Sequence, residues 1–235
     1  VDTDIQFLIR EELIKYQEIF RAKGSAAILM NVNNGEILSM VSLPDFNLNK
    51  RETIKDVNYI NKVTKGLYEL GSVFKTFTFA AGLNEGVIEV NTKFLNLPKS
   101  ISCAGFPIRE YNNKIPPDLT AEEILIRSGN IGSVRIAQRL GIDKFKLFLE
   151  NIGVLSQIIF DIEEVAQQQK FSWGKCKLAT ASFGHGITTT ILQLAKGYSI
   201  IVNGGFEIKP TLIKKNKKKL VKRKRLLKEG ISEKI

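Results

Sequence analysis

The segment that most constrains the fold is an almost continuously apolar stretch over residues 72–84. Its apolar side chains would fall on all sides of a helix rather than on one stripe: Val73, Phe74, Phe77, Phe79, Ala80, Ala81 and Leu83. A helix that is apolar all round is buried in a core. Gly86 stands where such a helix usually ends. We therefore expect a buried helix over this segment, not a surface one.

The length and composition of the chain support a core of this kind. It has 235 residues, of which 43% are hydrophobic and 25% charged, and this balance excludes disordered, collagen-like and coiled-coil proteins. Chains of this size bury about 70% of the surface that they expose when unfolded. We expect one domain with a subdomain.

The first part of the chain predicts a helix followed by a hairpin. Residues 4–22 carry apolar side chains at helical spacing, and Gly24 ends the pattern. Two apolar runs follow, over residues 26–32 and 36–43, and Asn33-Asn34-Gly35 joins them. Asn-Gly between two such runs is the strongest short hairpin signal. We interpret these runs as central strands of an antiparallel sheet.

The middle of the chain predicts three short helices. Thr120 and Glu123 form a capping box that opens a helix reaching about residue 126. Helices over 131–140 and 143–151 follow, with glycines as breakers. We interpret residues 87–165 as a helical subdomain inserted into a sheet part over 24–86 and 166–235. The last predicted elements are a helix over 190–203 and a strand over 206–214.

The net charge of +11 comes almost entirely from one segment. Residues 214–228 hold ten Lys or Arg and no acid, so the rest of the chain has 25 basic and 24 acidic residues. A basic surface over the whole domain, as nucleic-acid binding requires, is therefore not expected. The tail itself is interpreted as a solvated loop, with contact to an anionic membrane or nucleic acid as the alternative.

The two cysteines and the uncharged runs give little information on compartment. Cys103 and Cys176 lie far apart without a metal-ligand spacing, and they predict neither a zinc site nor a disulfide framework. The longest uncharged run, residues 178–195, is too polar to span a bilayer. We expect the chain as given to be soluble or peripherally held.

Ser72 and Lys75 have the spacing of a catalytic pair. At positions i and i+3 of a helix their side chains rise from the same face, about 5–6 Å apart. A Ser hydroxyl needs a base, and a Lys that is desolvated among Phe side chains can serve as one. The alternative is an ordinary helix-capping serine. Ser172 and Lys175 repeat the spacing, but no apolar helix follows them.

A second motif lies between two of the predicted helices. Ser128-Gly129-Asn130 is the only Ser-x-Asn in the chain. The Ser128 hydroxyl could relay a proton, and the Asn130 amide could hold both a Lys and a substrate carbonyl. The alternative is a cap for the helix that begins near residue 131.

Together these motifs resemble the class B penicillin-binding proteins, and within them the division-specific, septal branch. The resemblance covers about residues 24–212. It is carried by Tyr68-Glu69-Leu70-Gly71-Ser72-Val73-Phe74-Lys75-Thr76-Phe77-Thr78, by Arg127-Ser128-Gly129-Asn130-Ile131-Gly132-Ser133-Val134 with Leu140-Gly141, and by Ala179-Thr180-Ala181-Ser182-Phe183-Gly184-His185-Gly186-Ile187, Leu192-Gln193-Leu194-Ala195 and Asn203-Gly204-Gly205.

The resemblance implies an α+β transpeptidase fold, an antiparallel sheet flanked by helices with an all-helical subdomain. It implies Ser72 as acylated nucleophile, Lys75 as its base, Ser128 as proton relay and Asn130 as substrate-binding residue. The implied partners are D-Ala-D-Ala stem peptides of peptidoglycan, β-lactams and membrane proteins of the division complex, with no cofactor, metal or nucleic acid. The implied location is the bacterial inner membrane, with the catalytic domain in the periplasm. His185, the only histidine, is expected to serve packing or loop geometry.

The chain also departs from the family pattern. The third motif, Lys-Thr-Gly or Lys-Ser-Gly, does not occur, and neither do the membrane anchor and the pedestal domain. We therefore expect an incomplete transpeptidase domain over residues 1–235 that is inactive by itself. The family's acidic position stays open between Glu163 and Glu164. A catalytically inactive penicillin-binding sensor or division scaffold is the first alternative function, and a nucleic-acid carrier the second.

Overall fold

The amino-terminal part of the structure is a helix packed on a two-stranded sheet. The computed structural model describes residues 1–47, 49–50, 59–112, 114–167, 170–174, 176–214 and 223–235. Helix α1 (Thr3–Ile19) is capped by Asp2, and strands β1 (Ser25–Met30) and β2 (Ile37–Leu43) pair antiparallel with Ser25 opposite Leu43. The predicted helix and hairpin are confirmed. The sheet has two strands among the described residues, so a central place for them stays a prediction.

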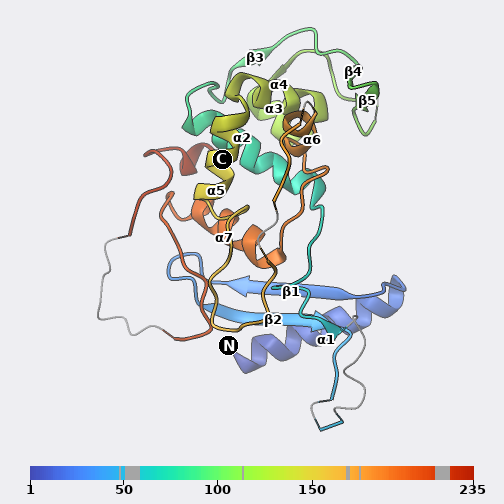
Figure 1. The fold of residues 1–235 in the computed structure, drawn as a ribbon, viewed down its shortest axis with the longest axis vertical. Helices are drawn as coiled ribbons and strands as arrows, with labels where there is room; N and C mark the ends of the chain where they lie inside the picture. Colours follow the sequence, from blue (N-terminus) through green and yellow to red (C-terminus); the bar gives the residue numbers. More distant parts are fainter. Residues whose placement is uncertain (48, 51–58, 113, 168–169, 175, 215–222) are drawn as a thin grey trace.

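Two helices cover the two faces of this sheet. Figure 1 shows α1 below the strands and α7 (Ile191–Val202) above them. The Gln6 side chain fixes α1, because its amide donates to the Met40 carbonyl and accepts from the Met40 N–H, at 2.9 Å each. Strand β2 alternates buried and half-buried residues, which is the pattern of a strand between two unlike layers.

The predicted buried helix is present and lies at the centre of the core. A short 3₁₀ turn, η3 (Gly71–Phe74), leads into α2 (Lys75–Asn84), and every residue of α2 except Thr76 is buried. Phe77 is fully buried and meets Phe74 and Tyr198 edge to face. One core cluster joins α2 to side chains from both predicted parts of the chain, including Ile136, Phe145 and Ile200.

The described part of residues 87–165, which leaves out residue 113, forms three helices and four short strands. Thr120 caps α3 through the predicted capping box with Glu123. The stretch is not all-helical, contrary to expectation, because two antiparallel strand pairs, β3–β6 and β4–β5, precede its helices. The elements are β3 (Lys93–Phe94), β4 (Ser100–Cys103), β5 (Phe106–Arg109), β6 (Leu119–Thr120), α3 (Ala121–Ile126), α4 (Asn130–Leu140) and α5 (Ile142–Asn151).

The structure answers one point that the sequence left open, the state of the two cysteines, and overturns one expectation, the strand over 206–214. Cys103 at the end of β4 forms a disulfide with Cys176, which precedes α6 (Lys177–Ala181). The fold brings the two cysteines together across 73 residues, which their spacing alone could not indicate. The predicted strand over 206–214 is irregular and makes only isolated bridges, partly because Pro210 has no N–H to donate to a ladder. A last 3₁₀ turn, η4, spans Ser232–Lys234.

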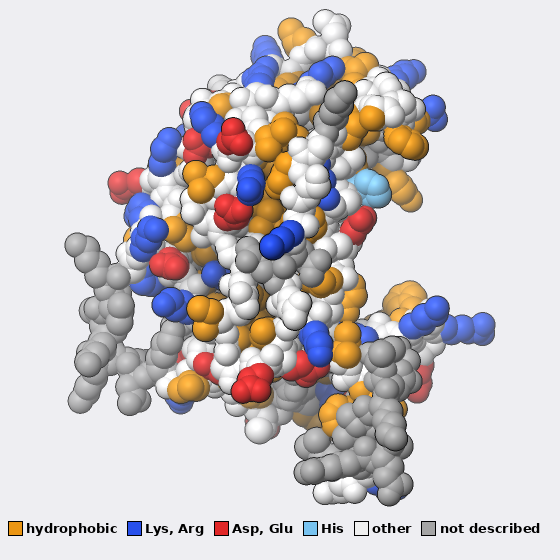
Figure 2. Space-filling model, viewed as in Figure 1, with side chains coloured by type: hydrophobic (Ala, Val, Ile, Leu, Met, Phe, Trp, Pro, Cys, Tyr) orange, Lys and Arg blue, Asp and Glu red, His pale blue; other side chains and the backbone are white. Residues whose placement is uncertain are grey.

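Among the described residues, no helix is long and apolar enough to cross a bilayer. On the face in Figure 2, Lys and Arg side chains alternate with Asp and Glu instead of gathering in one patch. Most of the predicted basic tail, residues 215–222, lies outside the described residues.

Candidate active site

Ser72 lies exposed on η3, one turn before the buried helix α2. Two contacts hold this turn in place. The Gly71 N–H donates to the Gly184 carbonyl at 3.3 Å, and the Tyr198 hydroxyl of α7 donates to the Val73 carbonyl at 2.7 Å. Ser72 caps neither η3 nor α2, so the interpretation of this residue as an ordinary capping serine is wrong.

Lys75 brings the two sequence motifs together. Its side chain is buried, with 2% of the residue exposed. Its Nζ donates to the Ser72 hydroxyl at 3.2 Å, to the Ser128 hydroxyl at 2.9 Å and to the Ser128 carbonyl at 2.5 Å. Burial lowers the pKa of Lys75 from 10.5 to about 8, although the negative charge of Glu110 opposes this shift. A Lys of this kind is neutral often enough near pH 7 to act as a base.

Ser128 has a backbone conformation that non-glycine residues seldom adopt. Its φ is +55°, which costs about 1–2 kcal/mol relative to the right-handed region. The conformation turns its carbonyl and hydroxyl to the Lys75 ammonium. Gly129, not Ser128, is the residue at the cap of α4, and it offers no side chain. The capping interpretation of Ser128 is therefore wrong, and such a strained residue is typical of a functional position.

Asn130 is the first residue of α4 and is fixed from the preceding hairpin. Its side-chain Nδ2 donates to the Arg109 carbonyl at 2.8 Å. Its backbone N–H donates to Glu110 at 2.6 Å, and the Ile131 N–H donates to the same carboxylate at 2.9 Å. No motif in the sequence marks Glu110. The one signal is that α4 begins after a glycine, so its first N–H groups need an acceptor from elsewhere.

The four predicted site residues open into one cavity of about 530 Å³. Phe183, Gly184 and His185 also line it. His185 was expected to serve packing or loop geometry, and its ring stacks on Phe183 with centroids 6.3 Å apart. Its side chain is 67% exposed, and its Nδ1 lies 3.2 Å from a Glu69 carboxylate oxygen. The remaining residues around the cavity are Gly71, Tyr111, Asn112, Ile115 and Arg127.

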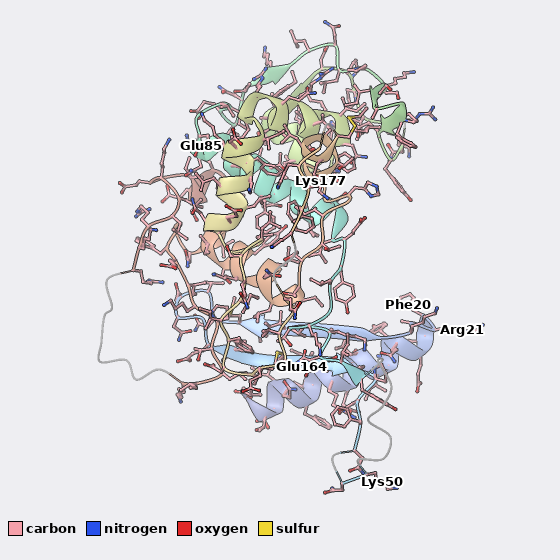
Figure 3. The ribbon with its side chains drawn as sticks, viewed as in Figure 1. Phe20, Arg21, Lys50, Glu85, Glu164 and Lys177 are labelled. Atoms are coloured by element: carbon pink, nitrogen blue, oxygen red, sulfur yellow. A yellow bond between two sulfur atoms is a disulfide. The ribbon has the colours of Figure 1, made fainter. Side chains whose placement is uncertain are left out.

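The other candidate residues lie apart from this cavity. Ser172 is in an irregular segment, and Lys175 lies outside the described residues. Glu164 accepts a hydrogen bond from the Asn61 N–H at 2.9 Å. Figure 3 shows Glu164 beside the β1–β2 sheet, whereas Lys177 lies at α6 in the upper part of the molecule. Among the described residues, Glu163 and Glu164 do not line the cavity.

The arrangement suits acyl transfer through a serine. It places an exposed hydroxyl, a buried amine with a lowered pKa and a second hydroxyl within hydrogen-bonding distance of one another. Within the described residues, no group of three His, Cys, Asp or Glu side chains could hold a metal ion.

Comparison with known proteins gives one consistent family. Residues 25–235 match the penicillin binding protein transpeptidase domain. The chain is 32% identical over 216 residues to the probable peptidoglycan D,D-transpeptidase FtsI of Caulobacter vibrioides, covering 92% of this chain and 36% of that protein. It is 27% identical over 213 residues to peptidoglycan D,D-transpeptidase FtsI of Escherichia coli, covering 87% and 35%. The chain thus spans about a third of the length of these relatives.

A solved structure has the same fold. The transpeptidase domain of penicillin-binding protein 3 from Burkholderia pseudomallei superposes with a TM-score of 0.86 at 24% identity, over 100% of this chain and 66% of that one. The α+β transpeptidase fold expected from the sequence is confirmed.

Proposed function

Since the chain belongs to the penicillin-binding protein transpeptidase domain family, we propose that its protein is a peptidoglycan D,D-transpeptidase of septal type. Ser72 Oγ attacks the carbonyl carbon of the penultimate D-Ala in a stem peptide. The peptide bond to the terminal D-Ala breaks, and that D-Ala leaves as the free amino acid. An amine of a neighbouring stem peptide then attacks the Ser72 ester, which forms the cross-link and returns the hydroxyl.

The contacts of Lys75 supply the proton path. Neutral Lys75 accepts the Ser72 proton across 3.2 Å as the Oγ–C bond forms. Ser128, 2.9 Å from the same nitrogen, passes a proton to the leaving amine. Asn130 is placed by its own hydrogen bond to Arg109 at the cavity wall, where its amide can position the substrate. The observation that carries the proposal is the buried Lys75 amine that contacts both serine hydroxyls.

The proposed site lies at the junction of the two proposed parts of the chain. Ser72 and Lys75 come from the sheet part over 24–86, whereas Ser128 and Asn130 come from the part over 87–165. A hydrogen-bond network between the parts therefore assembles the site.

We further propose a periplasmic catalytic domain anchored in the inner membrane of a bacterium, with membrane proteins of the division complex as partners. The names of the FtsI relatives support the division role. The disulfide between Cys103 and Cys176 supports an oxidising compartment, where such bonds persist. Stem peptides ending in D-Ala-D-Ala are the proposed substrate, and β-lactams are proposed to acylate Ser72 as mimics of that terminus.

The test is covalent labelling of the full-length protein with a fluorescent penicillin. Full length is needed because a Lys-Thr-Gly or Lys-Ser-Gly motif does not occur in these 235 residues. We expect the wild-type protein to be labelled, Ser72→Ala to lose the label, and Ser172→Ala, the same change in the second Ser-x-x-Lys, to keep it. A wild-type protein that is folded but unlabelled would contradict the proposal. Labelling without cross-linking of stem peptides would favour the inactive sensor.

A further inference from the structure

Glu110 belongs to none of the sequence motifs, yet its carboxylate holds the start of the helix that carries one of them. It directly follows β5, and its two oxygens accept the N–H groups of Asn130 and Ile131 at 2.6 and 2.9 Å. These N–H groups belong to the first turn of α4 and have no partner within the helix. A carboxylate at this end of a helix is also favoured by the helix dipole.

The backbone at Glu110 is held in place by contacts of the preceding β4–β5 hairpin. The β4–β5 hairpin that carries it is tied at Cys103 to Cys176 by the disulfide. On the other strand, Ile108 is buried in a cluster with Val134 of α4. The hairpin is therefore fixed to α4 and, through the disulfide, to the start of α6, the helix that leads to Phe183, Gly184 and His185 at the cavity.

On these grounds we propose that Glu110 is a positioning residue for the acyl transfer proposed above, on which this inference rests. Its carboxylate holds the first turn of α4 and thereby fixes Asn130. Its negative charge stabilises the ammonium form that Lys75 takes when it accepts the Ser72 proton. Glu110 does not touch the reacting atoms. It acts through Asn130 and Lys75.

The electrostatics of Lys75 agree with this role. The negative charge of Glu110 raises the pKa of Lys75, against the larger effect of burial. Neither the helix dipole nor a neutral amide at position 110 would supply this negative charge. The other titratable side chains around the same cavity are Glu69, Tyr111, Arg127 and His185.

The experiment measures the rate of acylation by a fluorescent penicillin against pH, in the full-length protein. The variants are Glu110→Gln, Glu110→Ala and Glu110→Asp. Of these, Glu110→Gln keeps one hydrogen-bond acceptor but removes the charge. Glu122→Gln is the matched control, because Glu122 is an exposed acid in the first turn of α3 and does not line the cavity.

We expect Glu110→Gln to move the rising limb of the pH profile to lower pH, since Lys75 loses a neighbour that favours its protonated form. Its plateau rate should fall about threefold, because a neutral amide caps the helix less well. Glu110→Ala should lower the plateau about tenfold or more, because two N–H groups lose their acceptor. Glu110→Asp should restore part of the rate, and Glu122→Gln should match the wild type.

A rising limb that stays in place in Glu110→Gln would overturn the proposal, because a purely structural cap would lower the plateau without moving the limb. Equal plateau rates in Glu110→Ala and the wild type would overturn it as well. A wild-type protein that is not acylated would instead contradict the proposed function, so the two failures are distinguishable.

Discussion

The pKa of Lys75 gives the most specific prediction for this site. In the mechanism proposed above, acylation requires Lys75 in its neutral form, and burial lowers the pKa of Lys75 from 10.5 to about 8. At about pH 7.5 this leaves about a quarter of the molecules with a neutral amine, against about one in a thousand for an unshifted Lys. The buried position therefore raises the active fraction by about two orders of magnitude.

The rate of acylation at Ser72 should follow that neutral fraction. It should rise about tenfold per pH unit at low pH, pass half of its maximum near pH 8 and level off above that. Stopped-flow fluorescence with a labelled penicillin, from about pH 6 to pH 10, measures the profile. Lys75→Arg should remove the reaction at every pH, because a guanidinium stays charged up to about pH 12 or above.

Two results would refute this reasoning. A profile whose midpoint lies near 10.5 would mean that Lys75 is not desolvated as its burial indicates. Acylation that persists in Lys75→Arg would mean that another group accepts the Ser72 proton. A thermal melt of each variant serves as control, so that lost acylation is not mistaken for lost folding.

Three further predictions concern the framework of the site. Changing both Cys103 and Cys176 to Ser should lower the free energy of unfolding by about 2–4 kcal/mol, measured in urea; no loss would show that the disulfide does not stabilise the fold. Phe77→Ala should cost about 3–5 kcal/mol in the same assay, and a cost below about 1 kcal/mol would contradict its full burial. Gly184→Ala should lower the melting temperature and the rate of labelling. A Cβ at this position would lie 2.1 Å from the Gly71 carbonyl oxygen, and the φ of Gly184 is +78°. An unchanged melting temperature and labelling rate would contradict this geometry.

Much of the helical framework could be predicted from the sequence because its signals are local. The apolar residues over 72–84 predicted the buried helix α2, and Thr120 with Glu123 predicted the start of α3. Helical spacing also predicted that Ser72 and Lys75 share one face, and the Ser-x-Asn motif indicated Ser128 and Asn130 before the family resemblance connected the two motifs. The structure places all four around one cavity.

The remaining features depend on contacts between distant parts of the chain. Glu110 caps a helix that begins 20 residues later, and the disulfide spans 73 residues. No periodicity or short motif carries such a pairing. His185 was expected to serve packing or loop geometry, and its ring does stack on Phe183, but its contact with Glu69 had no signal in the sequence. Local patterns predict elements, whereas the tertiary arrangement decides which loops meet.

The most direct test of the central claim is to locate the acyl-enzyme. The full-length protein is treated with benzylpenicillin, digested and analysed by tandem mass spectrometry. We predict that the adduct lies on Ser72, whose exposed hydroxyl is 3.2 Å from Lys75 Nζ. An adduct on Ser128, on Ser172 or on another residue of the folded protein would contradict it.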